Sequence, residues 1–137
     1  MEGKRGQIST EYLIVVGFIT FLVISVLGAG LFYSSQISDR IKINQLTNFA
    51  NKVISSSNSV FFAGEPSRVV INAYLPPGIS DLEVLQNEIV FNVSTSSGIT
   101  RISFSSKVPI SGVISNSEGV KRIQIAALSD KIILSEG

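Results

Sequence analysis

The feature that most constrains this chain is a run of 22 residues, 12–33, without a single charged side chain. As an α-helix the run would be about 33 Å long, against a bilayer hydrocarbon core of about 30 Å. A secretory signal that is removed has a shorter apolar region, of about 7 to 15 residues, with its cleavage site after that region. The run therefore predicts a membrane-spanning helix that stays in the mature protein, and a plain single-pass anchor would already account for it.

The charges that flank the run bear on its orientation. Lys4 and Arg5 precede it, and the tendency of basic residues to stay inside predicts a cytoplasmic N-terminus and an exported C-terminal part. Arg40 and Lys42 follow the run close to Asp39, which makes the asymmetry modest. The expected location of the precursor is thus the cell membrane, with its N-terminus in the cytoplasm.

A short motif stands between the basic pair and the apolar run. It reads Gly6-Gln7-Ile8-Ser9-Thr10-Glu11. Gln-x-Ser-x-Glu before an apolar helix resembles the class III signal peptide of archaeal type IV pilin-like proteins, over residues 4–33. The resemblance implies that a prepilin peptidase cuts between Gly6 and Gln7, so that residues 1–6 are a cleavable leader. Archaellin leaders usually lack this motif, which makes a rotating motor filament the lesser expectation.

The chemistry of Glu11 agrees with this interpretation. An unpaired carboxylate at the entrance of an uncharged helix is expensive near hydrocarbon, so it needs a partner. The resemblance implies that Gln7, Ser9 and Glu11 serve assembly, with Glu11 meeting the new α-amino group of Gln7 in a neighbouring subunit. At 4 Å and an effective dielectric of 20 the attraction is about 4 kcal/mol before desolvation. Alternatively, Glu11 is an interfacial acid near a helix N-terminus, worth up to about 1 kcal/mol, and Ser9 only a helix cap.

The helix is expected to continue beyond the apolar run. Apolar residues recur with a period close to 3.6 while polar residues fill the other face, and these are Ile37, Ile41, Leu46, Phe49, Ala50, Val53 and Ile54. The serine-rich segment 55–59 predicts the end, because its side chains compete for backbone hydrogen bonds. The predicted transmembrane and assembly helix is therefore 7–58.

The remainder, 59–137, alternates between apolar and polar residues as strands do. Breaks such as Pro76-Pro77-Gly78, Ser96-Ser97-Gly98 and Ser111-Gly112 recur at intervals that suit five to seven strands. The predicted fold is α+β, with a long N-terminal hydrophobic helix followed by a small antiparallel β-sheet or β-sandwich domain. Asn92-Val93-Ser94 is an acceptor sequence for N-glycosylation, and Asn92 is a candidate site on an extracellular domain.

Composition excludes most other functions. The chain has no His and no Cys, so imidazole bases, thiol nucleophiles and thiolate zinc sites are absent, and a net charge of +1 offers no basic field for nucleic acid. Asp81 and Glu83 share one face of a strand, yet nothing accompanies them as a catalytic set. We therefore expect no enzymatic activity, no catalytic residues, no cofactor and no metal site.

The expected function is that of a structural pilin, polymerised through its hydrophobic helix into a surface filament after cleavage. Its partners would be other copies in a helical filament or other pilins, the prepilin peptidase, and the membrane before assembly. Two alternatives remain. One is a minor pilin or anchored extracellular binding module that uses the same export route, and the other is an anchored β domain with no filament.

Overall fold

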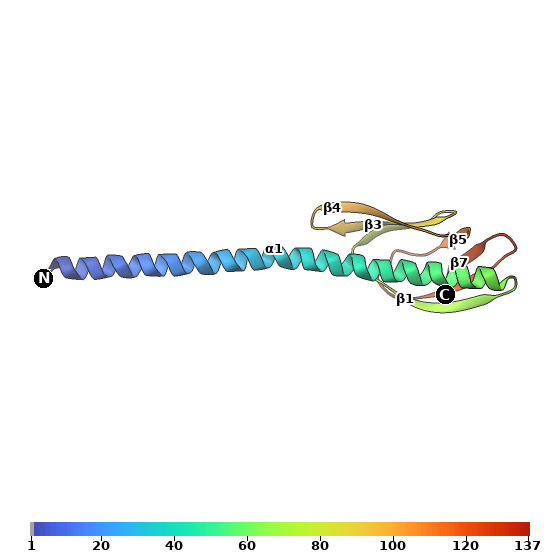
Figure 1. Ribbon diagram of the computed structural model, residues 1–137, viewed down its shortest axis with the longest axis horizontal. Coiled ribbons are helices and arrows are strands. Elements are labelled where there is room, and N and C mark those ends of the chain that lie inside the picture. The colour runs from blue at the N-terminus through green and yellow to red at the C-terminus, as the bar shows by residue number, and fades with distance from the viewer. Residues whose placement is uncertain (1) are drawn as a thin grey trace. The chain divides into compact units, whose positions relative to one another are not determined.

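The computed structural model describes residues 2–137 and the side chains of residues 6–137. One helix, α1 (Glu2–Ala63), is followed by strands, as the sequence pattern predicts (Figure 1). Two compact units meet between Ser38 and Asp39. The first is the N-terminal part of α1, and the second combines the C-terminal part of α1 with all the strands. The predicted α+β fold is confirmed.

The helix ends later than predicted. It continues through the serines at 55–59 because their hydroxyls bond within the helix: Ser57 Oγ donates to the Val53 carbonyl at 2.8 Å and Ser59 Oγ to the Ser55 carbonyl at 3.1 Å. Gly64 provides the end instead. Its φ of +82° is left-handed backbone that glycine adopts without strain, and its N–H donates to the Val60 carbonyl at 3.2 Å.

The described residues form seven strands in two sheets. Their bounds are β1 (Arg68–Leu75), β2 (Ile79–Val84), β3 (Glu88–Thr95), β4 (Gly98–Ser105), β5 (Ile110–Val113), β6 (Gly119–Ala127) and β7 (Ile132–Glu136). One sheet has the order β1-β6-β7-β5 and the other the order β2-β3-β4. We call the four-stranded sheet sheet A and the three-stranded sheet sheet B. All neighbouring strands are antiparallel except β5 and β7, which are parallel.

Two of the predicted turns are present and one is not. Pro76-Pro77-Gly78 connects β1 to β2, and Ser96-Ser97 is the two-residue turn of the β3–β4 hairpin. Ser111-Gly112, expected as a break, lies inside β5. Gly112 is needed there because a Cβ on it would lie 2.0 Å from the Leu134 carbonyl oxygen of β7. The glycine permits close approach of two strands and does not mark a turn.

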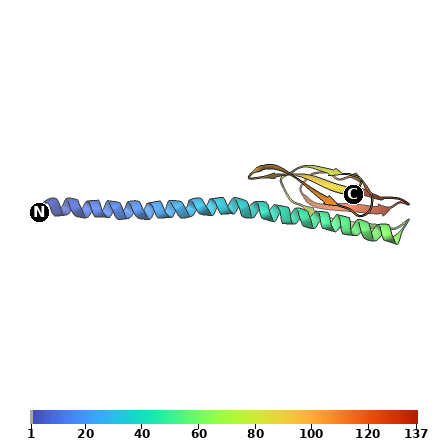
Figure 2. The ribbon, with the colours of Figure 1, turned by 45° about the horizontal axis from the view of Figure 1, so that its top comes forward.

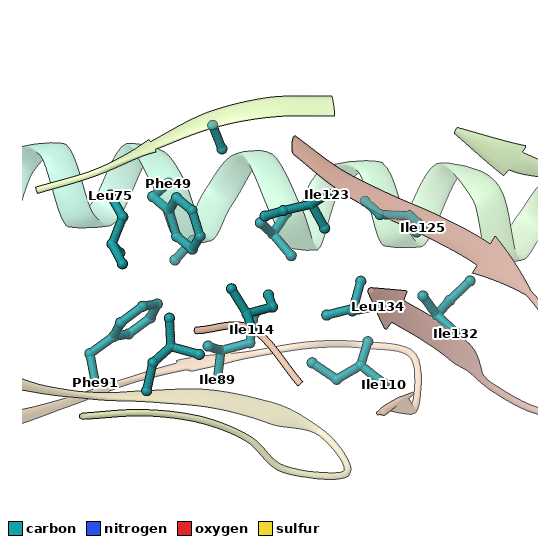
Figure 3. Packing of buried hydrophobic residues seen from close by; sticks show 14 of the residues in the cluster. Phe49, Leu75, Ile89, Phe91, Ile110, Ile114, Ile123, Ile125, Ile132 and Leu134 are labelled. Atoms are coloured by element: carbon teal, nitrogen blue, oxygen red, sulfur yellow. The ribbon is translucent and has the colours of Figure 1, made fainter. Parts of the chain in front are cut away.

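One core unites the C-terminal part of α1 with both sheets (Figures 2 and 3). The helix contributes fully buried Leu46, Ala50 and Val53, as its period predicts, whereas Ile37 and Ile41 stay exposed. Phe49 packs edge-on against Phe91 of β3, with ring centroids 6.0 Å apart. Labelled side chains from the helix and both sheets converge on this region in Figure 3: Phe49, Leu75, Ile89, Phe91, Ile110, Ile123, Ile125, Ile132 and Leu134.

Polar side chains of α1 form hydrogen bonds with β1 and with the β3–β4 hairpin. Lys52 Nζ donates to the Asn72 carbonyl of the edge strand β1, and Lys42 Nζ donates to the Ser94 carbonyl at 2.8 Å. Asp39 accepts from the Ser96 backbone N–H at 3.1 Å. The lysine over β1 occupies a backbone acceptor that an unprotected edge strand would offer to another chain.

Candidate functional site

The motif residues lie together at the beginning of α1. Gly6, Gln7, Ser9 and Glu11 are all helical and exposed, and Thr10 Oγ1 donates to the Gly6 carbonyl at 2.9 Å. Among the side chains of residues 6–137, Glu11 takes part in no ion pair. The peptide bond between Gly6 and Gln7 is therefore inside a helix, and a protease would have to unwind this first segment to reach it.

The helix that follows is apolar on every side. Between Ile8 and Ile37, 18 large apolar side chains are 41–73% exposed, and every residue from Gly6 to Ser38 is exposed. The few hydroxyls are satisfied within the helix: Thr20 Oγ1 donates to the Val16 carbonyl at 2.7 Å and Ser25 Oγ to the Phe21 carbonyl at 2.8 Å. A helix of this kind belongs in lipid or among other apolar helices.

This helix is long and apolar enough to cross a membrane. Fully burying a large apolar side chain is worth about 1.5–3 kcal/mol, so covering 18 half-exposed ones is worth on the order of 20 kcal/mol. The N-terminal part of α1 is thus the strongest docking feature of the chain, and what covers it decides the function.

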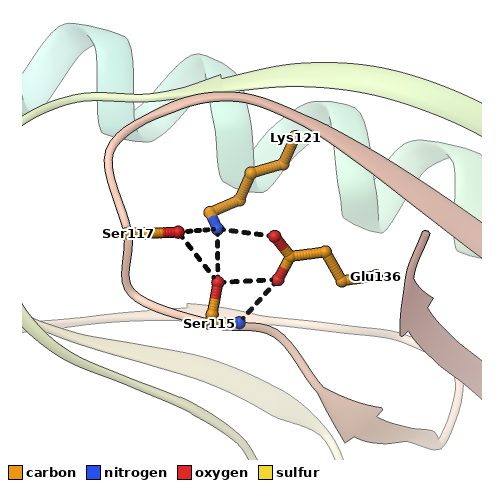
Figure 4. Close-up of polar contacts among 4 residues, drawn as sticks. All are labelled: Ser115, Ser117, Lys121 and Glu136. Carbon is orange, nitrogen blue, oxygen red and sulfur yellow. Dashed lines mark hydrogen bonds and ion pairs between the residues drawn. The ribbon is translucent and has the colours of Figure 1, made fainter.

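Apart from the motif at the start of α1, the structure contains a buried ionic cluster that the sequence did not lead us to predict (Figure 4). The Lys121 side chain is 3% exposed, and its ammonium donates three hydrogen bonds: to Ser115 Oγ at 2.7 Å, to Ser117 Oγ at 2.9 Å and to Glu136 Oε1 at 3.0 Å. Every donor of the ammonium is used. The cluster joins the 114–118 loop, β6 and the end of β7.

Glu136 completes this cluster. Its Oε2 accepts from the backbone N–H of Ser115 at 2.9 Å and from the Ser115 hydroxyl at 2.7 Å. Together with the hydrogen bond from Lys121, which has a smaller effect, these two hydrogen bonds lower the pKa of Glu136 from 4.5 to about 2. The carboxylate is therefore charged at neutral and mildly acidic pH.

The sequence did contain a signal for this cluster. Lys121 has the same parity as Ile123 and Ile125 in β6, and Glu136 has the same parity as Ile132 and Leu134 in β7. Inward-facing positions of two neighbouring strands that carry opposite charges predict a buried pair.

The remaining carboxylates do not gather. Asp81 and Glu83 are exposed on the outer face of β2, and in the described part of the chain no group of three or more His, Cys, Asp or Glu could hold a metal ion. Asn92 lies half-buried on the central strand β3, between Asp81 of β2 and Arg101 of β4 in the register. Its glycosylation stays a prediction.

Comparison with protein-family models, with curated proteins and with solved structures gives no match for this chain.

Proposed function

We propose that this protein is a structural subunit of an archaeal type IV pilus-like surface filament, cleaved between Gly6 and Gln7 and assembled through its apolar helix. The observation that carries the proposal is the apolar surface of residues 6–38, which no described part of the chain covers. Lipid would cover it before assembly. Helices of neighbouring copies would cover it afterwards. The strands, which share one core with the C-terminal part of α1, would face solvent.

The position of Glu11 favours assembly over simple anchoring. An anchor gains at most about 1 kcal/mol from a carboxylate near the helix N-terminus, and the charge resists entry into hydrocarbon. In a bundle of copies, the α-amino group created at Gln7 would neutralise it. Cleavage would then supply the cation that assembly requires, so that only processed subunits polymerise.

The proposal is tested by N-terminal mass spectrometry of protein taken from sheared surface filaments of the native cells. We expect a product that starts at Gln7 and that makes up most of the filament mass. Protein that begins at Met1 and stays in membranes after shearing would contradict the proposal.

A pair of matched variants separates assembly from anchoring. Glu11→Gln should abolish filaments while processing and membrane insertion continue, because the partner of the α-amino group is lost. Glu65→Gln removes an exposed carboxylate in the loop after α1 and should leave filaments unchanged. Unchanged filaments in Glu11→Gln would indicate an anchored β domain.

The alternative function, a minor pilin or an anchored extracellular binding module, differs in copy number. A major subunit outnumbers every other component of the filament, whereas a tip component is present in a few copies. Counting this chain relative to total filament protein distinguishes the two.

A further inference from the structure

The two sheets carry opposite charges on their outer faces. On the outer face of sheet A, β1 and β6 bring Arg68 and Arg122, and the outward positions of its strands include no acidic side chain. On the outer face of sheet B the charged side chains are Asp81, Glu83, Glu88 and Arg101. The side-chain charge is therefore +2 on one face and −2 on the other.

These charges are available to a partner. Arg68, Arg122, Asp81 and Glu83 are all exposed, and among the described side chains the one ion pair joins Lys121 to Glu136. The core lies between the inner faces of the sheets, so the outer faces point away from each other. A single chain cannot bring its own two faces together.

The basic face also has exposed apolar side chains at one end of β1 and β6. Tyr74 of β1 and Val120 of β6 are opposite each other in the register and are 43% and 73% exposed. Arg122 is two residues from Val120 on the same face. An aromatic residue beside an arginine has the composition of a protein-binding surface.

We infer that the outer face of sheet A binds the outer face of sheet B in a second copy of this chain. Such a contact joins different surfaces of the two copies, so each bound copy presents a new free face, and the contact repeats as an open helix when the rotation between copies does not close a ring. A filament needs an open contact of this kind. The inference deepens the proposed function and rests on it, since it assigns a contact between β domains in addition to the packing of apolar helices.

Charge reversal on whole faces tests the contact. Arg68→Glu with Arg122→Glu turns the basic face to −2, and Asp81→Lys with Glu83→Lys turns the acidic face to +2. Each double variant then has two faces of like sign. We expect at least about tenfold fewer assembled subunits for each, in filaments sheared from cells at physiological salt.

Two combinations show whether the faces act on each other. A chain with all four reversals has its charges exchanged and should again form filaments. The two double variants, deficient alone, should assemble together when expressed in one cell, as alternating copies. If the double variants failed only because they misfold, neither the fourfold variant nor the co-expressed pair would form filaments.

The matched control is Lys107→Glu with Lys131→Glu. It changes the charge of the whole chain as much as the sheet A variant does, but at loop positions outside both faces. We expect normal filaments from it.

Filaments of normal number in either face variant would overturn the inference. Loss of filaments in the control would also overturn it, as would loss of filaments in the sheet A variant while the sheet B variant assembles normally. Loss in the sheet A variant alone would mean that the basic face binds a different, anionic partner. If the wild-type cells carry this chain only as a membrane-bound monomer, the proposed function fails and this contact fails with it. If wild-type filaments exist and every face variant assembles, only the contact fails.

Discussion

Removing the carboxylate from the ionic cluster should destabilise the β domain more than removing the lysine. Glu136→Gln leaves the ammonium of Lys121, on a side chain that is 3% exposed, without a negative charge beside it, since the serine hydroxyls and the new amide oxygen are all neutral acceptors. Breaking a buried pair in this way costs about 3–5 kcal/mol, and we expect about 2 kcal/mol here because the Glu136 side chain is 30% exposed.

Lys121→Met removes the buried charge and keeps an unbranched apolar stem. The Glu136 carboxylate still accepts from the Ser115 N–H and hydroxyl and still reaches water. We expect a change within about 1 kcal/mol, of either sign, because replacing a buried charge by an apolar side chain of similar size is often neutral.

The pH dependence follows from the lowered pKa of Glu136. A carboxyl that binds its proton less readily in the folded state adds stability above its unfolded pKa, 4.5, and loses it as the pH falls towards about 2. The shift is equivalent to about 3 kcal/mol, and exposure reduces the expected loss to about 1–2 kcal/mol. The free energy of unfolding should fall over this window in the wild type and change less in Glu136→Gln.

The assay is urea unfolding of the full chain in detergent micelles, followed by circular dichroism of the strands, at pH 7 and at steps from 4.5 to 2. Lys121→Met with Glu136→Gln should lie closer to the wild type than Glu136→Gln alone. If Lys121→Met were the more damaging single change, the reasoning would be refuted, and packing of the lysine stem would outweigh the stranded charge.

Three further outcomes are expected. Gly112→Ala should cost more stability than Gly98→Ala in the same unfolding assay, by about 2 kcal/mol or more, because both have positive φ but only at Gly112 would the Cβ meet the Leu134 carbonyl; equal losses would contradict the close approach. Phe91→Ala, at a fully buried position, should cost about 3–5 kcal/mol, and a loss below about 1 kcal/mol would exclude it from the core. Leu13→Ala should leave unfolding of the β domain unchanged and lower filament yield, since Leu13 is 66% exposed in the single chain; a large stability loss would mean that the helix packs on its own domain.

Local pattern was enough to predict the helix and most strands. The apolar run and the 3.6 period between Leu46 and Val53 identified α1, and alternation identified β1, β3 and β6. These features depend on neighbours in sequence, since a helix face or strand face repeats over a few residues.

The features that could not be predicted from the sequence depend on contacts between residues that are distant in the chain. The parallel pairing of β5 with β7 has no local signature, and it changes Gly112 from a turn residue into a point of close contact. The serines at 55–59 could end a helix or bond back within it, and only packing of the following turn, where Val60 is buried, decides between the two. For the candidate site, sequence located the motif at 6–11 but not the cluster of Lys121, whose partner is 15 residues away.

The shared helix has a consequence for how the exterior of this protein can be obtained separately. A fragment that begins at residue 59, where the composition changes, would lack Leu46, Phe49, Ala50 and Val53, and the sheets would expose the surface that these side chains cover. Such a fragment should aggregate or stay unfolded. A fragment that begins near Asp39 keeps both the buried helix face and its links to Ser94 and Ser96 while omitting the apolar run. The natural point of division is thus inside a continuous helix, where neither a turn nor a change in composition marks it.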